Sequence, residues 1–165
     1  MSSFNRDGVK RRLVEILAAA LGSEWDVSYE WPGDDVGDRW LYLDAAVDGS
    51  TDNPTTKGAP GSKRLTIDTF AFDALLCVQG CENAQVAEKL AADGVRLVDD
   101  TLRRLTHLKD PTEVIGDGTA ADYEGVQSAR LTRVQGPAAS APQPGDDLLS
   151  GMCLLTITCT SHFTS

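Results

Sequence analysis

The sequence predicts an α+β domain in which two helices pack on one face of a single, mostly antiparallel sheet. Two segments, residues 7–21 and 83–108, carry apolar side chains at helical spacing, and five other segments have strand patterns. The expected order is therefore α-β-β-β-α-β-β, and short connections between strands favour antiparallel pairing. At 165 residues the chain is long enough for one domain with its own core, so residues 1–165 are expected to fold as one unit.

The first predicted helix covers residues 7–21, where the apolar side chains form one stripe. Asp7 is a suitable N-cap, and Gly22 is a suitable C-terminal stop. The basic cluster at residues 10–12 is expected to face solvent.

The second predicted helix covers residues 83–108 and has the stronger apolar stripe. Asn83 can cap it. Gly94 lies in its middle, where glycine costs about 1 kcal/mol relative to alanine. Either close packing against the sheet or a slight break in the helix would explain this glycine.

The strand segments alternate between apolar and polar residues or are apolar throughout. They are residues 25–31, 40–47, 63–79, 126–134 and 148–163. The first two flank an acidic turn built on Trp31-Pro32-Gly33, and they are expected to form a β-hairpin. Residues 74–78 are apolar on both faces, which indicates either a central strand or a bulge near Asp73. Residues 48–62 and 135–147 are predicted to be long loops.

The acidic composition disfavours a surface that grips nucleic acid, because the formal net charge is -10. Residues 25–63 carry eight acidic residues against three basic ones, a net charge of -5. A solvated, solubilising surface is one interpretation. The functional interpretation is a face that must not adhere to DNA that passes close by.

Patterns for catalysis or cofactor binding are missing from the sequence. It contains no nucleophile elbow and no glycine-rich phosphate loop. His107 and His162 are expected to be core or solvated residues. The spacing of the four cysteines does not match a zinc ribbon. We therefore expect no enzyme, no metal and no cofactor.

The four cysteines are expected to be reduced, buried thiols; they are Cys77, Cys81, Cys153 and Cys159. The start of the chain does not resemble a secretory signal, and no apolar stretch approaches the roughly 18 residues of a membrane span. The chain is thus expected to fold in the cytoplasm, without a membrane partner.

The whole arrangement resembles the tail terminator proteins of long-tailed bacteriophages, especially those of actinobacterial hosts. The resemblance covers nearly the full chain and rests on the order of elements and on seven segments. These are VKRRLVEILAAAL, VSYEWPGD, WLYL, RLTIDTFAFDALLCVQG, the second helix, VQSARLTRVQG and LLSGMCLLTITCT. Related tail-completion and neck proteins share this fold.

The resemblance implies a structural virion protein that is assembled in the host cytoplasm and lies at the tail–neck junction. Such proteins form a hexameric ring that caps the tail tube and ends polymerisation of the major tail tube protein. The ring offers a surface to the head-side connector or stopper protein, and DNA passes through its lumen without specific binding. An acidic inner surface would suit this passage, because like charges repel phosphates.

The two long loops, residues 48–62 and 135–147, are the expected contacts with neighbours in such a stack. The residues expected at an interface are Asp34, Asp35, Asp38, Asp52, Lys57, Arg130 and Arg133. Three alternatives remain. They are another neck or tail-completion protein of the same fold, a small non-enzymatic regulatory binding module, and, more remotely, an enzyme that depends on Cys77 and Cys81.

If the acidic turn faces the lumen of a ring, Asp34→Lys and Asp35→Lys should slow DNA ejection, because the new cations attract passing phosphates. Tails should keep their normal length. The measurement is the rate of DNA release from purified particles. An unchanged rate would place the turn outside the channel.

Overall fold

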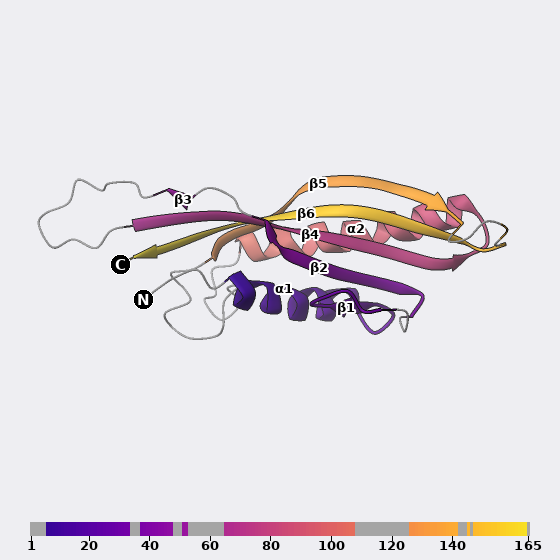
Figure 1. The fold of residues 1–165 in the computed structure, drawn as a ribbon, viewed down its shortest axis with the longest axis horizontal. Coiled ribbons are helices and arrows are strands. Elements are labelled where there is room, and N and C mark those ends of the chain that lie inside the picture. The colour runs from indigo at the N-terminus through magenta and orange to yellow at the C-terminus, as the bar shows by residue number, and fades with distance from the viewer. Residues whose placement is uncertain are drawn as a thin grey trace, which may run out of the picture.

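The computed structural model is an α+β fold with one mixed sheet and two helices (Figure 1). It describes residues 6–33, 37–47, 51–52, 65–107, 126–141, 145 and 147–164. The elements are α1 (Arg6–Leu21), β1 (Asp26–Ser28), β2 (Arg39–Val47), β3 (Thr51–Asp52), β4 (Leu65–Cys81), α2 (Ala84–His107), β5 (Val126–Ser140) and β6 (Leu149–Thr164).

The strand order in the sheet is β1-β2-β4-β6-β5, and the short β3 pairs with β4 beyond the end of β2. The predicted α+β class is confirmed, but the predicted order is wrong because β3 adds a strand within residues 48–62. The sheet is also mixed, since β1 and β2 pair in parallel. The predicted hairpin over the first two strands is therefore wrong, because a tight hairpin joins only antiparallel strands.

Both predicted helices form with nearly the predicted ends, but Asp7 is not the N-cap of α1, because the helix already includes Arg6. Gly22 has a positive φ of 87° and donates to the Ala18 carbonyl at 3.1 Å, which ends α1. The Asn83 side-chain oxygen accepts from the Val86 amide at 2.9 Å and so caps α2. The expectation that Lys10 faces solvent is wrong, because Lys10 is buried. Its ammonium lies 3.9 Å from the centre of the Tyr29 ring.

The long strands explain the elongated outline of the sheet in Figure 1. β4 has 17 residues, so it spans roughly 56 Å at about 3.3 Å per residue. β4 lies between β2 and β6, which confirms the prediction that residues 74–78 belong to a central strand. The register between β2 and β4 shifts opposite Asp73, where β2 has two residues between Leu43 and Ala46, whereas β4 stays in register with β6.

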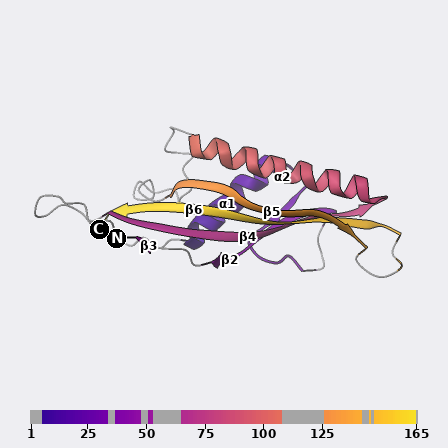
Figure 2. The ribbon, with the colours of Figure 1, turned by 90° about the horizontal axis from the view of Figure 1, so that it is seen from above.

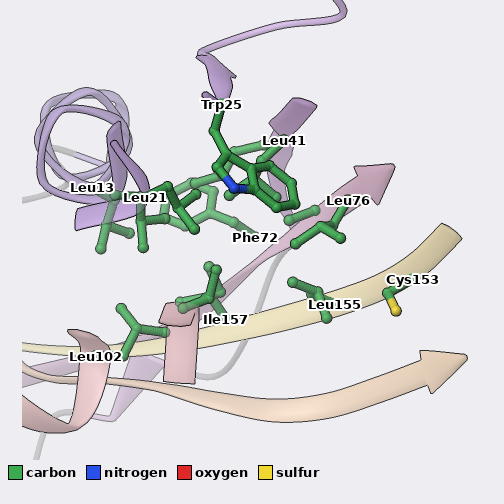
Figure 3. Close-up of a cluster of buried hydrophobic side chains, with 14 of the residues drawn as sticks. Leu13, Leu21, Trp25, Leu41, Phe72, Leu76, Leu102, Cys153, Leu155 and Ile157 are labelled. Atoms are coloured by element: carbon green, nitrogen blue, oxygen red, sulfur yellow. The ribbon is translucent and has the colours of Figure 1, made fainter. Parts of the chain in front are cut away.

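One hydrophobic core lies between the sheet and the two helices. α2 runs along the sheet over β5 and β6 (Figure 2), and α1 contacts both α2 and the β1–β2 end of the sheet. Figure 3 shows Trp25 beside Leu41 and Leu76, between the α1 side chains and the sheet. Trp25 thus joins the α1 side of the core to the α2 side.

Two glycines allow α2 to approach its neighbours closely. A Cβ atom at Gly94 would lie 2.6 Å from the Trp25 ring and 3.0 Å from Leu76. A Cβ atom at Gly151 on β6 would lie 2.8 Å from the Ala87 carbonyl carbon. α2 continues through Gly94, so close packing explains this glycine and a helix break does not.

Gly94→Ala should lower the free energy of unfolding by about 1 kcal/mol, because the overpacking of Trp25 outweighs the gain in helix propensity. In a Trp25→Phe background the smaller ring leaves room for the methyl group, so the same change should raise stability. Denaturant unfolding of the four proteins measures both effects. Stabilisation by Gly94→Ala in both backgrounds would contradict the packing argument.

Candidate interaction surface

The sheet face opposite the helices is the most unusual surface among the described residues. Side chains that are paired across strands point to the same face. Leu76 and its partners in register belong to the helix-covered core, so the residues next to them point the other way. This second face, which we call the open face, carries Trp40, Tyr42, Leu75, Met152 and Leu154 in the middle three strands.

The apolar residues of the open face form one patch with Trp31, which we call the open-face patch: Trp31, Trp40, Tyr42, Leu75, Met152 and Leu154. Leu154 is 52% exposed, Trp31 is 54% exposed and Met152 is 36% exposed. Exposed apolar groups in one contiguous patch commonly mark an interaction site. Single exposed apolar residues would carry no such meaning.

Trp31 covers one corner of this patch. Its ring packs edge-on against Trp40, with centroids 5.4 Å apart, and against Tyr42, with centroids 5.2 Å apart. Beneath it the Trp40 indole nitrogen is buried, and no described residue accepts its hydrogen bond. Burial and the nearby Asp44 carboxylate raise the pKa of Tyr42, so its hydroxyl stays neutral.

Acidic side chains gather at the β1–β2 end of the sheet. Described residues 24–47 include Glu24, Asp26, Glu30, Asp38 and Asp44, all exposed, and Arg39 as the one described cation in that range. Arg39 pairs with Glu24 at 2.9 Å. Lys10 of α1 interacts with the Asp44 and Glu30 carboxylates. Five carboxylates against these two cations leave a net negative charge among these residues.

The opposite end of the sheet has a groove of about 430 Å³ between α2 and β5, which we call the α2–β5 groove. Its lining is Ala92, Val95, Arg96, Asp99, Arg103, Leu131, Thr132, Arg133 and Val134. The apolar side chains are accompanied by three guanidinium groups and one carboxylate. Asp99 pairs with Arg103 at 3.0 Å and Asp93 pairs with Arg96 at 3.8 Å, so Arg133 is the cation of the lining that has no ion-pair partner among the described residues.

Of the predicted interface residues, the structure describes the side chains of Asp38, Arg130 and Arg133, and it does not place Asp38 beside the two arginines. Asp38 is exposed at the β1–β2 end, whereas Arg130 and Arg133 are exposed on β5 at the other end of the sheet. Asp34, Asp35 and Lys57 lie outside the described residues. Asp52 lies in β3, and its side chain is also outside the described part.

The predicted loop at residues 135–147 is wrong over its first part, because β5 continues to Ser140. Three register shifts along β5 accommodate the irregular residues, including Pro137, which has no amide to donate. Most of the predicted loop at residues 48–62 lies outside the described residues.

The open-face patch was not predicted from the sequence. A signal was present, because residues 152–155 are apolar on both faces in the same way as residues 74–78. These two segments pair in register in the structure, with Leu75 opposite Leu154 and Cys77 opposite Met152. An apolar strand beside another apolar strand indicates a sheet that is apolar on both sides.

The chain matches no known family model, and no curated protein is similar to it. Within the described residues, no cluster of three or more histidine, cysteine or acidic side chains is placed to hold a metal ion. No described helix is long and apolar enough to cross a membrane.

The cysteines are free and buried, as predicted from the sequence. Burial raises the pKa of the Cys77 thiol from 9.0 to about 11 and that of Cys159 from 9.0 to about 12. Burial also raises the pKa of Cys153. These thiols therefore stay protonated at neutral pH, which disfavours a thiolate nucleophile at Cys77.

Iodoacetamide at pH 8 should leave Cys77, Cys153 and Cys159 unmodified in the folded protein and should modify them after unfolding, because burial and a raised pKa both suppress the thiolate. Mass spectrometry of the labelled peptides provides the measurement. Rapid labelling of Cys77 in the folded protein would instead support a reactive thiol.

The same shifts predict a pH dependence of stability. The thiols of Cys77 and Cys159 ionise near pH 9 in the unfolded chain, whereas their pKa values in the folded protein are about 11 and about 12. Their contribution is therefore complete below pH 9 and is lost as the pH rises toward 12. Denaturant unfolding between pH 7 and pH 10.5 should show a falling free energy of unfolding above pH 9, with Cys159→Ala reducing the slope.

Proposed function

We propose that this chain is a structural ring protein that caps the tail tube of a long-tailed bacteriophage and joins the tail to the head-side connector. The observation that carries the proposal is the open-face patch, because exposed apolar side chains on a sheet face that no described helix covers suit a protein that acts by assembling. The resemblance of the sequence to tail terminators gives this assembly its specific form.

The shape of the sheet also supports the proposal. β4, β5 and β6 have 17, 15 and 16 residues, whereas strands in globular proteins usually have about 3 to 10. Such long strands make an extended wall, which suits a subunit that contacts neighbours above and below it as well as beside it. The net charge of -10 suits a protein through which DNA passes without adhering.

A phage that lacks this gene should make tubes of uncontrolled length that do not join heads, since nothing would end polymerisation of the tube protein. Electron microscopy of lysates measures tail length, and cryo-EM of complete particles should place a six-fold ring of this chain between tube and connector. Tails of normal length joined to heads would reject the proposal. A ring elsewhere in the neck would favour a related neck protein, and absence from the particle would favour a regulatory binding module.

Leu154→Glu should fold normally but fail to restore normal tails, because it places a charge in the middle of the open-face patch. Val86→Glu is the matched control, since Val86 is 39% exposed on α2 and lies outside the patch. Complementation of the gene deletion by each variant gives the readout, and thermal unfolding checks the fold. Equal complementation by both variants would exclude the open-face patch from assembly.

A further inference from the structure

Two surfaces at opposite ends of the sheet match each other in charge and in chemistry. One is the 29–31 segment, which consists of Tyr29, Glu30 and Trp31. The other is the α2–β5 groove. We propose that the groove of one subunit receives the 29–31 segment of a second copy of this chain, so that subunits join head to tail. This inference rests on the proposed ring and names the surfaces that would build it.

The 29–31 segment is exposed and wraps around one edge of the sheet. Tyr29 contacts Lys10 of α1 on the helix-covered side, whereas Trp31 contacts Trp40 and Tyr42 on the open face. Tyr29 is 41% exposed and Glu30 between them is also exposed, although its carboxylate interacts with the Lys10 ammonium of the same subunit. The segment therefore presents a carboxylate flanked by two aromatic rings, and aromatic residues are the side chains most enriched at interfaces.

The α2–β5 groove has the features that such a segment requires. Val95, Leu131 and Val134 provide apolar contact, and Val134 is 44% exposed. Arg133 has no ion-pair partner in the part of the chain that the structure describes. A guanidinium beside an apolar surface can pair with a carboxylate and also stack on an aromatic ring.

The charge distribution favours a second copy as the occupant. Each subunit has a net charge of -10, so association requires local complementarity to overcome the overall repulsion. The acidic β1–β2 end and the basic α2–β5 groove supply this complementarity within one chain.

The positions of the two surfaces also fit a head-to-tail arrangement. β1 and β5 are the two end strands of the β1-β2-β4-β6-β5 path, which places the surfaces about 19 Å apart at about 4.8 Å per strand. They do not overlap, so one subunit can use both at once. An interface between two different surfaces generates a ring when its rotation closes.

The irregularity of β5 decides the kind of contact. Three register shifts and Pro137 interrupt the outer edge of this strand, which disfavours the addition of a continuous strand from a neighbour. The α2–β5 groove beside this strand remains accessible to side chains of a neighbouring subunit. The contact is therefore made by side chains and does not extend the sheet.

The first test is a cross-link between two full-length single variants. Trp31→Cys and Val134→Cys proteins are mixed and oxidised with diamide, and the disulfide-linked pair is measured on non-reducing gels and by mass spectrometry. The native cysteines are buried, so we expect them to contribute only a low background of disulfide formation. Linking should be at least about tenfold faster than for Trp31→Cys mixed with Val86→Cys, because the interface raises the local concentration of the two thiols.

The second test exchanges the charges. Glu30→Arg and Arg133→Glu should each weaken self-association by at least about tenfold, measured by sedimentation velocity, because each places like charges together. Combining them in one chain should restore association to within about threefold of wild type. Arg130→Glu is the matched control: it makes the same change on β5 outside the groove and should have less than about a threefold effect.

The outcomes separate this inference from the proposed function. Equal linking of the groove and control pairs, or no rescue by the combined charge exchange, overturns the head-to-tail contact and leaves the groove to another partner. The ring and its role in ending the tail would then still stand if complete particles show them. Failure of the gene deletion to alter tails rejects the proposed function whatever the cross-links show.

Discussion

The close approach of α2 to the sheet and to Trp25 is the constraint on which the rest of the structure depends. Gly151 lets the first turn of α2 lie against β6, and Gly94 receives the Trp25 ring. Because α2 packs close to the sheet and to Trp25, one hydrophobic core includes side chains of both helices. The same placement leaves the space between α2 and β5 that forms the α2–β5 groove.

A two-layer arrangement has a consequence for the other side of the sheet. Both helices pack on one face, so the central strands can bury only half of their apolar side chains within the described part of the subunit. β4 and β6 are nevertheless apolar on both faces where Leu75 pairs with Leu154. The apolar side chains of the open face are thus available to other molecules, which is the physical basis for proposing an assembly role.

The acidic character of the chain has a more specific meaning in the structure than in the sequence. A net charge of -10 indicates only repulsion between subunits and from DNA. In the fold, exposed carboxylates lie beside β1 and β2, and Arg133 is exposed on β5 without an ion-pair partner among the described residues. The guanidinium groups of Arg96 and Arg103 on α2 lie beside Asp93 and Asp99.

The sequence by itself determined both helices, the Asn83 cap and the Gly22 stop, the long central strand and the four buried thiols. These features depend on local spacing and on the burial preferences of single residues, so Asn83 and Gly22 could be assigned without a structure. Only the tertiary structure decided the parallel pairing of β1 with β2, the extension of β5 to Ser140 and the burial of Lys10. Strand partners and the exposure of a face depend on residues far apart in the chain, and no local pattern records them.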